Sequence, residues 1–302
     1  MRNSRTKNVF LILIWSLVAA VAVYFLYSAV QSGEFTFQQK YEGEPSVILS
    51  DVTLSESVES LAIEWISGGV KIIPTTGDKI RIVEKAYKVI AENKEVKITV
   101  LNSKLELVSR NKAVFNFLWF TSAPTFLEVY LPITTNFNLI KLKGVSGNYS
   151  IDDVYSNLIQ VDLVSGNLTL DNSFAALLSM DLTSGNAVIK DSELLSADIE
   201  ITSGQLNYAA KTQSFKIKMT SGTMKLDLLE QLPQSLSLKM TSGSANITLH
   251  GTDGFGFVVK KTSGSFTTDF EVITSGNTYT YKSGGPLYTV DLTSGSVNTH
   301  LK

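Results

Sequence analysis

The fold of this chain is decided by a repeat that begins GVSGNYSI (144–151), LVSGNLTL (163–170) and LTSGNAVI (182–189). Five more copies follow: ITSGQLNY (201–208), MTSGTMKL (219–226), MTSGSANI (240–247), KTSGSFTT (261–268) and LTSGSVNT (292–299). Successive Ser-Gly pairs are 18 to 21 residues apart, except that 31 residues separate the last two. A period of this length indicates a repeat architecture.

Apolar residues alternate on both sides of each Ser-Gly pair. In one copy, Ile159, Val161 and Leu163 precede the pair, and Leu168 and Leu170 follow it. Alternation with a period of two is typical of a strand with one buried face. The parity changes across the pair, so the chain must bend there, and glycine permits such a backbone without steric cost. Asparagine, which also tolerates a left-handed backbone, follows the glycine at positions 148, 167 and 186.

Each unit therefore predicts a strand, a corner, a second strand and a polar turn, and it is too small to bury its apolar face alone. Stacked units bury that face continuously, which predicts an all-β fold, a β-solenoid with parallel strands. A β-propeller is excluded because it requires roughly 40–50 residues per blade. The same pattern occurs upstream, where Leu61, Ile63 and Trp65 precede Ser67-Gly68, so we expect the first coil to start near Ser60.

The two ends of the predicted solenoid are less regular. Between Gly77 and Thr135 the repeat is lost while the alternation persists, which predicts longer strands or hairpins. We therefore divide the β-domain into an irregular part, 46–145, and regular repeats, 146–302. Near the C-terminus, Ser283-Gly284 also fits the spacing. If Ser283-Gly284 forms a corner, Ser294 lies on a short closing strand or hairpin.

An apolar run precedes the β-domain. VFLILIWSLVAAVAVYFLYSAV (9–30) has 22 residues, and as a helix it spans roughly 33 Å, enough for a bilayer core of ~30 Å. Basic residues precede this run and none follows it before Lys40, so 1–8 is expected in the cytoplasm and the C-terminal domain outside. We predict a single-pass anchor in the cell membrane, followed by a polar stalk, 31–45. A cleaved signal peptide is the alternative, although its apolar region is normally shorter.

Composition excludes several classes of function. The chain has no cysteine, which excludes disulfides, thiolate metal sites and a cysteine nucleophile. Its formal net charge of −2 argues against a nucleic-acid partner, because nucleic-acid-binding surfaces are usually basic. The two histidines, His250 and His300, both come late in the chain, so no Ser-His-Asp triad is expected. We predict a protein that is not an enzyme and has no cofactor.

Three features together resemble a known bacterial family. They are the segment from Leu61 to Ile72, the V-x-L-P step from Val129 to Pro132, and the serial T-S-G-[NS] coils. The family is the "putative adhesin" β-repeat, a toastrack-like domain of unknown function, and the resemblance covers roughly 46–302. A membrane-anchored copy is similar to the LiaG-type proteins of cell-envelope stress systems. The resemblance implies a solenoid outside the cytoplasm, with a role in adhesion or envelope-stress sensing, and it implies no catalytic residues.

The residue three positions before each repeat serine should point to solvent. This position is acidic in three successive coils and basic in the next three: Asp162, Asp181, Glu200, Lys218, Lys239 and Lys260. Stacked carboxylates are suited to a divalent cation, and the lysines are suited to an anionic polymer or lipid headgroups. The alternative for both groups is a solvated face whose long side chains splay apart.

A further candidate is AVFNFLWF (113–120), in which five of eight residues are Phe, Leu or Trp. Its aromatic residues form a predicted patch for a partner or for the outer membrane surface, namely Phe115, Phe117, Trp119 and Phe120. The alternative is a cap over the open end of the solenoid.

These features predict a non-catalytic, membrane-anchored solenoid that acts as a binding or scaffold module at the bacterial cell envelope, in envelope-stress response or adhesion. The expected partners are a cell-wall polymer, lipid headgroups or an envelope-stress membrane protein. Two alternatives stay open. One is a glycan-binding or carbohydrate-active surface protein, and the other is a structural rod that self-associates through exposed strand edges.

Overall fold

All the elements of the described residues are β-strands. The computed structural model describes residues 43–302 apart from 90–94, 110–123 and 252. Across these residues, no helix has the length and apolar character needed to cross a bilayer. The predicted transmembrane helix 9–30 and nearly all of the predicted stalk lie outside the described residues. The chain divides into Met1–Glu44 and Pro45–Lys302, and the described strands all belong to the second unit.

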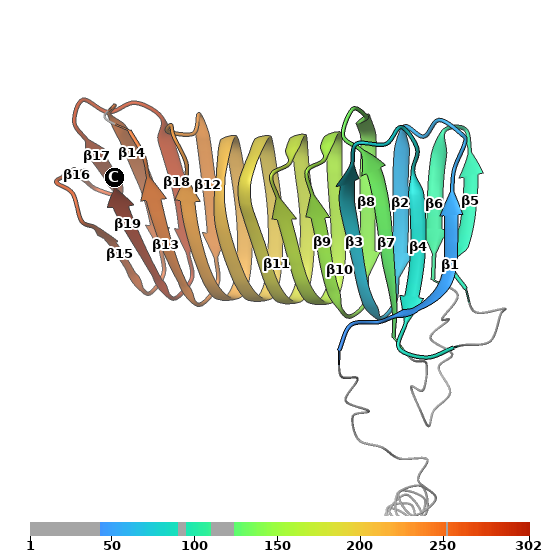
Figure 1. The fold of residues 1–302 in the computed structure, drawn as a ribbon. Helices are drawn as coiled ribbons and strands as arrows, with labels where there is room; N and C mark the ends of the chain where they lie inside the picture. Colours follow the sequence, from blue (N-terminus) through green and yellow to red (C-terminus); the bar gives the residue numbers. More distant parts are fainter. Residues whose placement is uncertain (1–42, 90–94, 110–123, 252) are drawn as a thin grey trace, which may run out of the picture. The chain divides into compact units, whose positions relative to one another are not determined.

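Each regular coil contributes one strand to each of two walls (Figure 1). In the coil around Ser146, β8 (Asn136–Gly144) precedes the corner and β9 (Asn148–Asp152) follows it. The next strand, β10 (Tyr155–Asp171), continues through its corner, and β11 (Phe174–Leu228) continues through three corners. β10 pairs in parallel with β8 and β9 on one side and with β11 on the other. The predicted stack of parallel coils is therefore confirmed in this part of the chain.

The core lies between the two walls and consists of the alternating apolar side chains. Ile159 and Val161 before the corner and Leu168 after it are at most 1% exposed. Equivalent residues of adjacent coils are in register, so that Val161 pairs with Met180. The inward positions that the period of two predicted are thus the buried ones.

Glycine at the corner meets two requirements at once. The φ angle is +131° at Gly166 and +130° at Gly185, the equivalent residue of the next coil, a region that side-chain-bearing residues rarely adopt. A Cβ on Gly185 would also lie 1.9 Å from the carbonyl oxygen of Gly166. The asparagines that follow these glycines form a ladder instead. The Asn167 side-chain amide donates to Asn148 Oδ1 (2.9 Å), and that of Asn186 donates to Asn167 Oδ1 (3.0 Å).

Among the described residues, seven strands form the N-terminal end: β1 (Val47–Thr53), β2 (Ser60–Trp65), β3 (Gly68–Thr75), β4 (Arg81–Ala86), β5 (Lys97–Leu101), β6 (Lys104–Val108) and β7 (Thr125–Pro132). The expected upstream coil is β2 and β3, but it does not end the stack. β2 pairs in parallel with β6 and β8, and β3 pairs in parallel with β7 and β9. Antiparallel pairs complete this end: β5 pairs with β6, and β4 pairs with both β7 and β1.

Eight strands form the C-terminal end: β12 (Ser235–Met240), β13 (Ser244–Leu249), β14 (Phe255–Lys261), β15 (Ser265–Thr268), β16 (Ile273–Ser275), β17 (Thr278–Tyr281), β18 (Leu287–Leu292) and β19 (Ser296–Leu301). The last coil of the sequence, β18 and β19, lies between two earlier coils. β18 pairs with β12 and β14, and β19 pairs with β13 and β15.

The expectation that coils follow one another in chain order is therefore wrong at this end. The hairpin of β16 and β17 pairs antiparallel with one edge of β14, so the returning chain adds its coil on the other edge. Ser294 lies at a regular corner rather than on a closing hairpin. Ser283-Gly284 is not a coil corner, because the Gly284 N–H donates to the Tyr281 carbonyl (3.1 Å) in the turn that follows β17.

Candidate functional site

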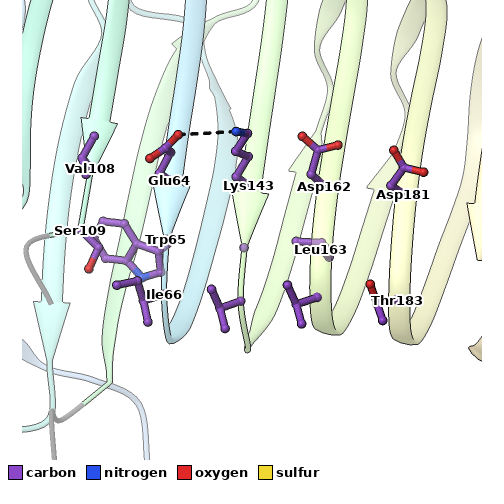
Figure 2. A pocket seen from close by; sticks show the side chains of 13 residues that line it. Glu64, Trp65, Ile66, Val108, Ser109, Lys143, Asp162, Leu163, Asp181 and Thr183 are labelled. Carbon is purple, nitrogen blue, oxygen red and sulfur yellow. Dashed lines mark ion pairs between the residues drawn. The ribbon is translucent and has the colours of Figure 1, made fainter. Parts of the chain in front are cut away.

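The outward position three residues before each corner serine forms a charged column on one wall. The strand register orders Glu64, Lys143, Asp162 and Asp181 along this column. Val108 of β6 lies beside Glu64 at its end, and Figure 2 shows the five side chains in this order. Glu64 and Lys143 are 79 positions apart in the sequence, yet they are neighbours here and form an ion pair with a 3.8 Å separation between Oε1 and Nζ.

A hollow of about 540 Å³ runs along this column on the side of the corners. Its apolar wall comes from the residue directly before the corner serine, which is Ile66, Val145 or Val164. Val145 and Val164 are 48% and 54% exposed. The buried side chains of Trp65 and Leu163 line the same hollow. The hollow therefore joins an exposed apolar row to a row of charges.

Sequence reasoning missed this apolar row, although a signal for it was present. In the three coils that form the apolar wall of the hollow, the residue before the corner serine is isoleucine or valine. In the six other coils it is threonine: Thr183, Thr202, Thr220, Thr241, Thr262 and Thr293. A comparison of this one position across all copies separates the coils that form the apolar wall from the others, one of which lines the hollow with Thr183.

Two carboxylates give one end of the hollow a negative charge. Asp162 and Asp181 are in register on adjacent coils. Loss of hydration is the largest cause that raises the pKa of Asp181, and the nearby carboxylates of Asp162, Glu200 and Asp198 raise it further, while Lys218 opposes them. The Asp181 carboxylate is therefore a group that would gain from a cationic neighbour.

Substitution of Asp181 by asparagine should raise the melting temperature near neutral pH. A raised folded-state pKa means that the folded protein holds this proton more tightly than the unfolded chain does, so stability is lost as the pH rises through the folded pKa. Asparagine carries no charge and so avoids this loss of stability. The gain in melting temperature should shrink as the pH falls towards the range in which carboxyl groups take up protons. Melting curves of the wild type and of Asp181→Asn at several pH values test this.

Asp291→Asn is the matched control for that experiment. Asp291 occupies the same column but lies between Lys239 and Lys260, so its loss should lower the melting temperature near neutral pH. Equal shifts of the same sign in both variants would contradict the role assigned to the local charges.

The predicted cation candidates are not grouped as a metal site. Glu200 forms an ion pair with Lys218, with 2.9 Å between Oε2 and Nζ. Throughout the described part of the chain, no three His, Cys, Asp or Glu side chains are placed to hold a metal ion together. We therefore propose no cation site at Asp162, Asp181 and Glu200.

The predicted lysine face is interrupted. Lys218 and Lys239 are in register on adjacent coils, but Asp291 lies between Lys239 and Lys260 because the last coil is inserted there. The expectation of three lysines on successive coils is therefore wrong in its geometry. The binding of an anionic ligand to these lysines stays a prediction.

The predicted aromatic patch, Phe115, Phe117, Trp119 and Phe120, lies outside the described residues. Ser109, which lines the hollow, is the last described residue before that segment. The partner or cap role of the patch stays a prediction.

Both histidines contact aspartates on the surface of the stack. His250 Nε2 lies 2.5 Å from Asp227 Oδ1, and His300 Nδ1 lies 2.8 Å from Asp269 Oδ2. Within the described ranges, no serine hydroxyl is hydrogen-bonded to either imidazole. A nucleophile, base and acid set of the serine-hydrolase type is therefore not assembled among these residues.

A comparison with the profiles of protein families identifies the family of this chain. The profile described as Toastrack DUF4097 matches residues 58–300. The chain belongs to the toastrack family. The matched range runs from just before β2 to the last residues of β19, so it covers the corners of all the coils in this toastrack domain. No curated protein matches the chain.

The comparison with solved structures finds similar chains at low sequence identity. A protein of Parabacteroides distasonis described as a "putative lipid binding protein" is 12% identical, with 85% of this chain and 97% of that chain covered and a TM-score of 0.54. A "putative adhesin" of Bacteroides fragilis is 13% identical, with 85% and 98% covered and a TM-score of 0.44. A "putative cell adhesion protein" of Clostridium sporogenes is 13% identical, with 86% and 100% covered and a TM-score of 0.32.

Proposed function

We propose that this toastrack protein is a non-catalytic binding module at the bacterial cell envelope, held at the membrane by 9–30 with its β-domain outside the cytoplasm. The observation that carries the proposal is the hollow beside the charged column, where an exposed apolar row meets charges of both signs. In this proposal, the module works in adhesion or envelope-stress response by holding its ligand in the hollow.

The chemistry of the hollow favours an amphipathic ligand with a zwitterionic head. An apolar chain would lie along Ile66, Val145 and Val164, because burying their exposed surface is favourable. An ammonium group of the head would lie near Asp162 and Asp181, whose charges repel each other without it.

Lys143 gives the head a second contact. It stands in the column between Glu64 and Asp162, where it can bind a phosphate that adjoins the ammonium group. A phosphoethanolamine lipid has this order of charges. The description of the Parabacteroides distasonis protein as lipid binding is in line with this proposal.

The test uses the unit Pro45–Lys302, whose buried cluster from Leu54 to Val297 gives it a core of its own. Dihexanoyl phosphatidylethanolamine and dihexanoyl phosphatidylglycerol are titrated below their micelle concentrations by calorimetry. We expect the ethanolamine lipid to bind about five-fold more tightly, the size of roughly one exposed ion pair.

Two variants decide whether the hollow is responsible. The double substitution Asp162→Asn with Asp181→Asn should abolish the preference, and Val164→Asp should weaken the binding of both lipids. Asp291→Asn lies on the same column outside the hollow and should change neither. Absence of binding, or binding that none of these variants alters, would overturn the proposal.

A further inference from the structure

A second hollow, of about 380 Å³, lies at the polar turns, where the chain passes from one coil to the next. Ten residues line it: Tyr155, Asn172, Ser173, Phe174, Asp191, Ser192, Glu193, Lys211, Leu229 and Glu230. None of them lines the first hollow. This site is therefore independent of the one on which the proposed function rests.

The floor of this second hollow is held in place by buried serines. The Ser173 hydroxyl donates to the Asp171 carbonyl (2.7 Å) and accepts from the Val154 N–H (3.2 Å). The Ser192 hydroxyl accepts from the Ser173 N–H (3.1 Å) and donates to the Lys190 carbonyl (2.8 Å). Because these bonds link successive coils, the groups above the floor are set on a fixed frame.

An aromatic pair borders the hollow. The rings of Tyr155 and Phe174 stack with 6.3 Å between centroids and 26° between planes, and Tyr155 is 50% exposed. The pair does not continue into the next coil. The Glu193 N–H donates to the Ser173 carbonyl (2.9 Å), which puts a glutamate at the position equivalent to Phe174. The pair of rings therefore ends next to the Glu193 carboxylate, and the hollow has an aromatic surface beside an acidic group.

Most of the other lining groups are polar, and the acidic ones outnumber the basic ones. Asp191, Glu193 and Glu230 contribute three carboxylates, and Lys211 is the one cation among the described residues that line the hollow. Lys211 Nζ is paired with Glu230 Oε2 at 2.6 Å. The Asp191 side chain is 70% exposed. The hollow thus offers hydrogen-bond acceptors and a negative charge beside an aromatic surface.

We propose that this second hollow binds pyranose sugars of a glycan that is neutral or carries amino groups. A pyranose ring presents an apolar face of C–H bonds, which packs on the Tyr155 and Phe174 rings. Its hydroxyls donate to the carboxylates and to the Asn172 carbonyl oxygen, as in sites where a few polar groups orient a ligand on an apolar surface. The negative charge favours an amino sugar and disfavours an anionic polysaccharide.

The test titrates the full chain, purified in a detergent without a sugar headgroup, with chitotetraose, its fully deacetylated form and tetragalacturonate. We expect both chitin-derived sugars to bind, the deacetylated form more tightly, and tetragalacturonate not to bind. Tyr155→Ala should weaken binding about ten-fold, the size of one aromatic contact, whereas Tyr155→Phe should keep it. Glu193→Gln should weaken the binding of the deacetylated sugar and leave the binding of the acetylated sugar unchanged.

Leu195→Ala serves as the control, because Leu195 is 37% exposed and does not line the hollow, although it lies two residues after Glu193 on the same strand. It should bind both sugars as the wild type does. The proposal is overturned if tetragalacturonate binds more tightly than the chitin-derived sugars, if neither of these binds, or if Tyr155→Ala, with an unchanged circular dichroism spectrum, binds as tightly as Tyr155→Phe.

Discussion

Replacement of Gly185 by alanine should lower the free energy of unfolding by ~4 kcal/mol or more. Two costs add at this position. The backbone has a φ of +130°, and the new Cβ would lie 1.9 Å from the Gly166 carbonyl oxygen. Because that oxygen belongs to the backbone of the adjacent coil, it can move only if the coils separate. Urea unfolding of Pro45–Lys302 measures the loss.

Gly276→Ala separates strain from the clash between coils. Gly276 also has a positive φ, +58°, but no atom lies within 4 Å of its added Cβ. We expect this variant to lose only ~1–2 kcal/mol, the cost of a left-handed alanine. If both variants lost the same free energy, close contact between the corners would not be what requires glycine at position 185.

Replacement of Phe257 by alanine should lower the free energy of unfolding by ~3–5 kcal/mol. Phe257 is fully buried at the C-terminal end of the stack. Its ring contacts those of Phe266 (5.2 Å between centroids), Tyr288 (5.5 Å) and Phe255 (5.8 Å). Loss of the ring removes three aromatic contacts. It also leaves a cavity that the neighbouring coils cannot fill without moving.

Two further variants make the Phe257 result interpretable. Phe257→Leu keeps most of the volume and should cost about 1–2 kcal/mol. Ile273→Ala removes a side chain that is 71% exposed and should change the free energy of unfolding by less than ~0.5 kcal/mol. A Phe257→Ala variant as stable as Ile273→Ala would show that this aromatic group does not hold the C-terminal coils.

The regular coils could be predicted from sequence because period-two alternation and glycine chemistry both act locally. Val161 and Leu168 are buried as their parity requires, and the positive φ falls on Gly166 and Gly185. The first coil also starts where predicted, with β2 at Ser60. Each of these features depends on a few neighbouring residues and on the same rule in every copy.

The order of coils at the two ends could not be predicted in this way. Which strand edge a coil adds to depends on which edges are already paired, and this information is spread over distant strands. Glu64 therefore lies beside Lys143, and Asp291 separates Lys239 from Lys260. The order of charged residues predicted from chain order was correct for Asp162 and Asp181. It was wrong where another coil is inserted.

The candidate site was only half visible in the sequence. Asp162 and Asp181 were singled out as charges, but the apolar row beside them was not. Val145 and Val164 sit at the corner, between the two alternating strands, where the period-two rule changes parity and assigns no direction. Their exposure follows from the geometry of the corner, which only the structure provides.

The most direct test of the central claim, that the hollow beside the charged column binds the ligand, is a methyl NMR map. Pro45–Lys302 with labelled isoleucine, leucine and valine methyl groups is titrated with dihexanoyl phosphatidylethanolamine. We predict that the largest shift changes occur at Ile66, Val145 and Val164, which line the hollow. Largest changes at methyl groups elsewhere on the stack, or no changes at saturating lipid, would contradict the claim.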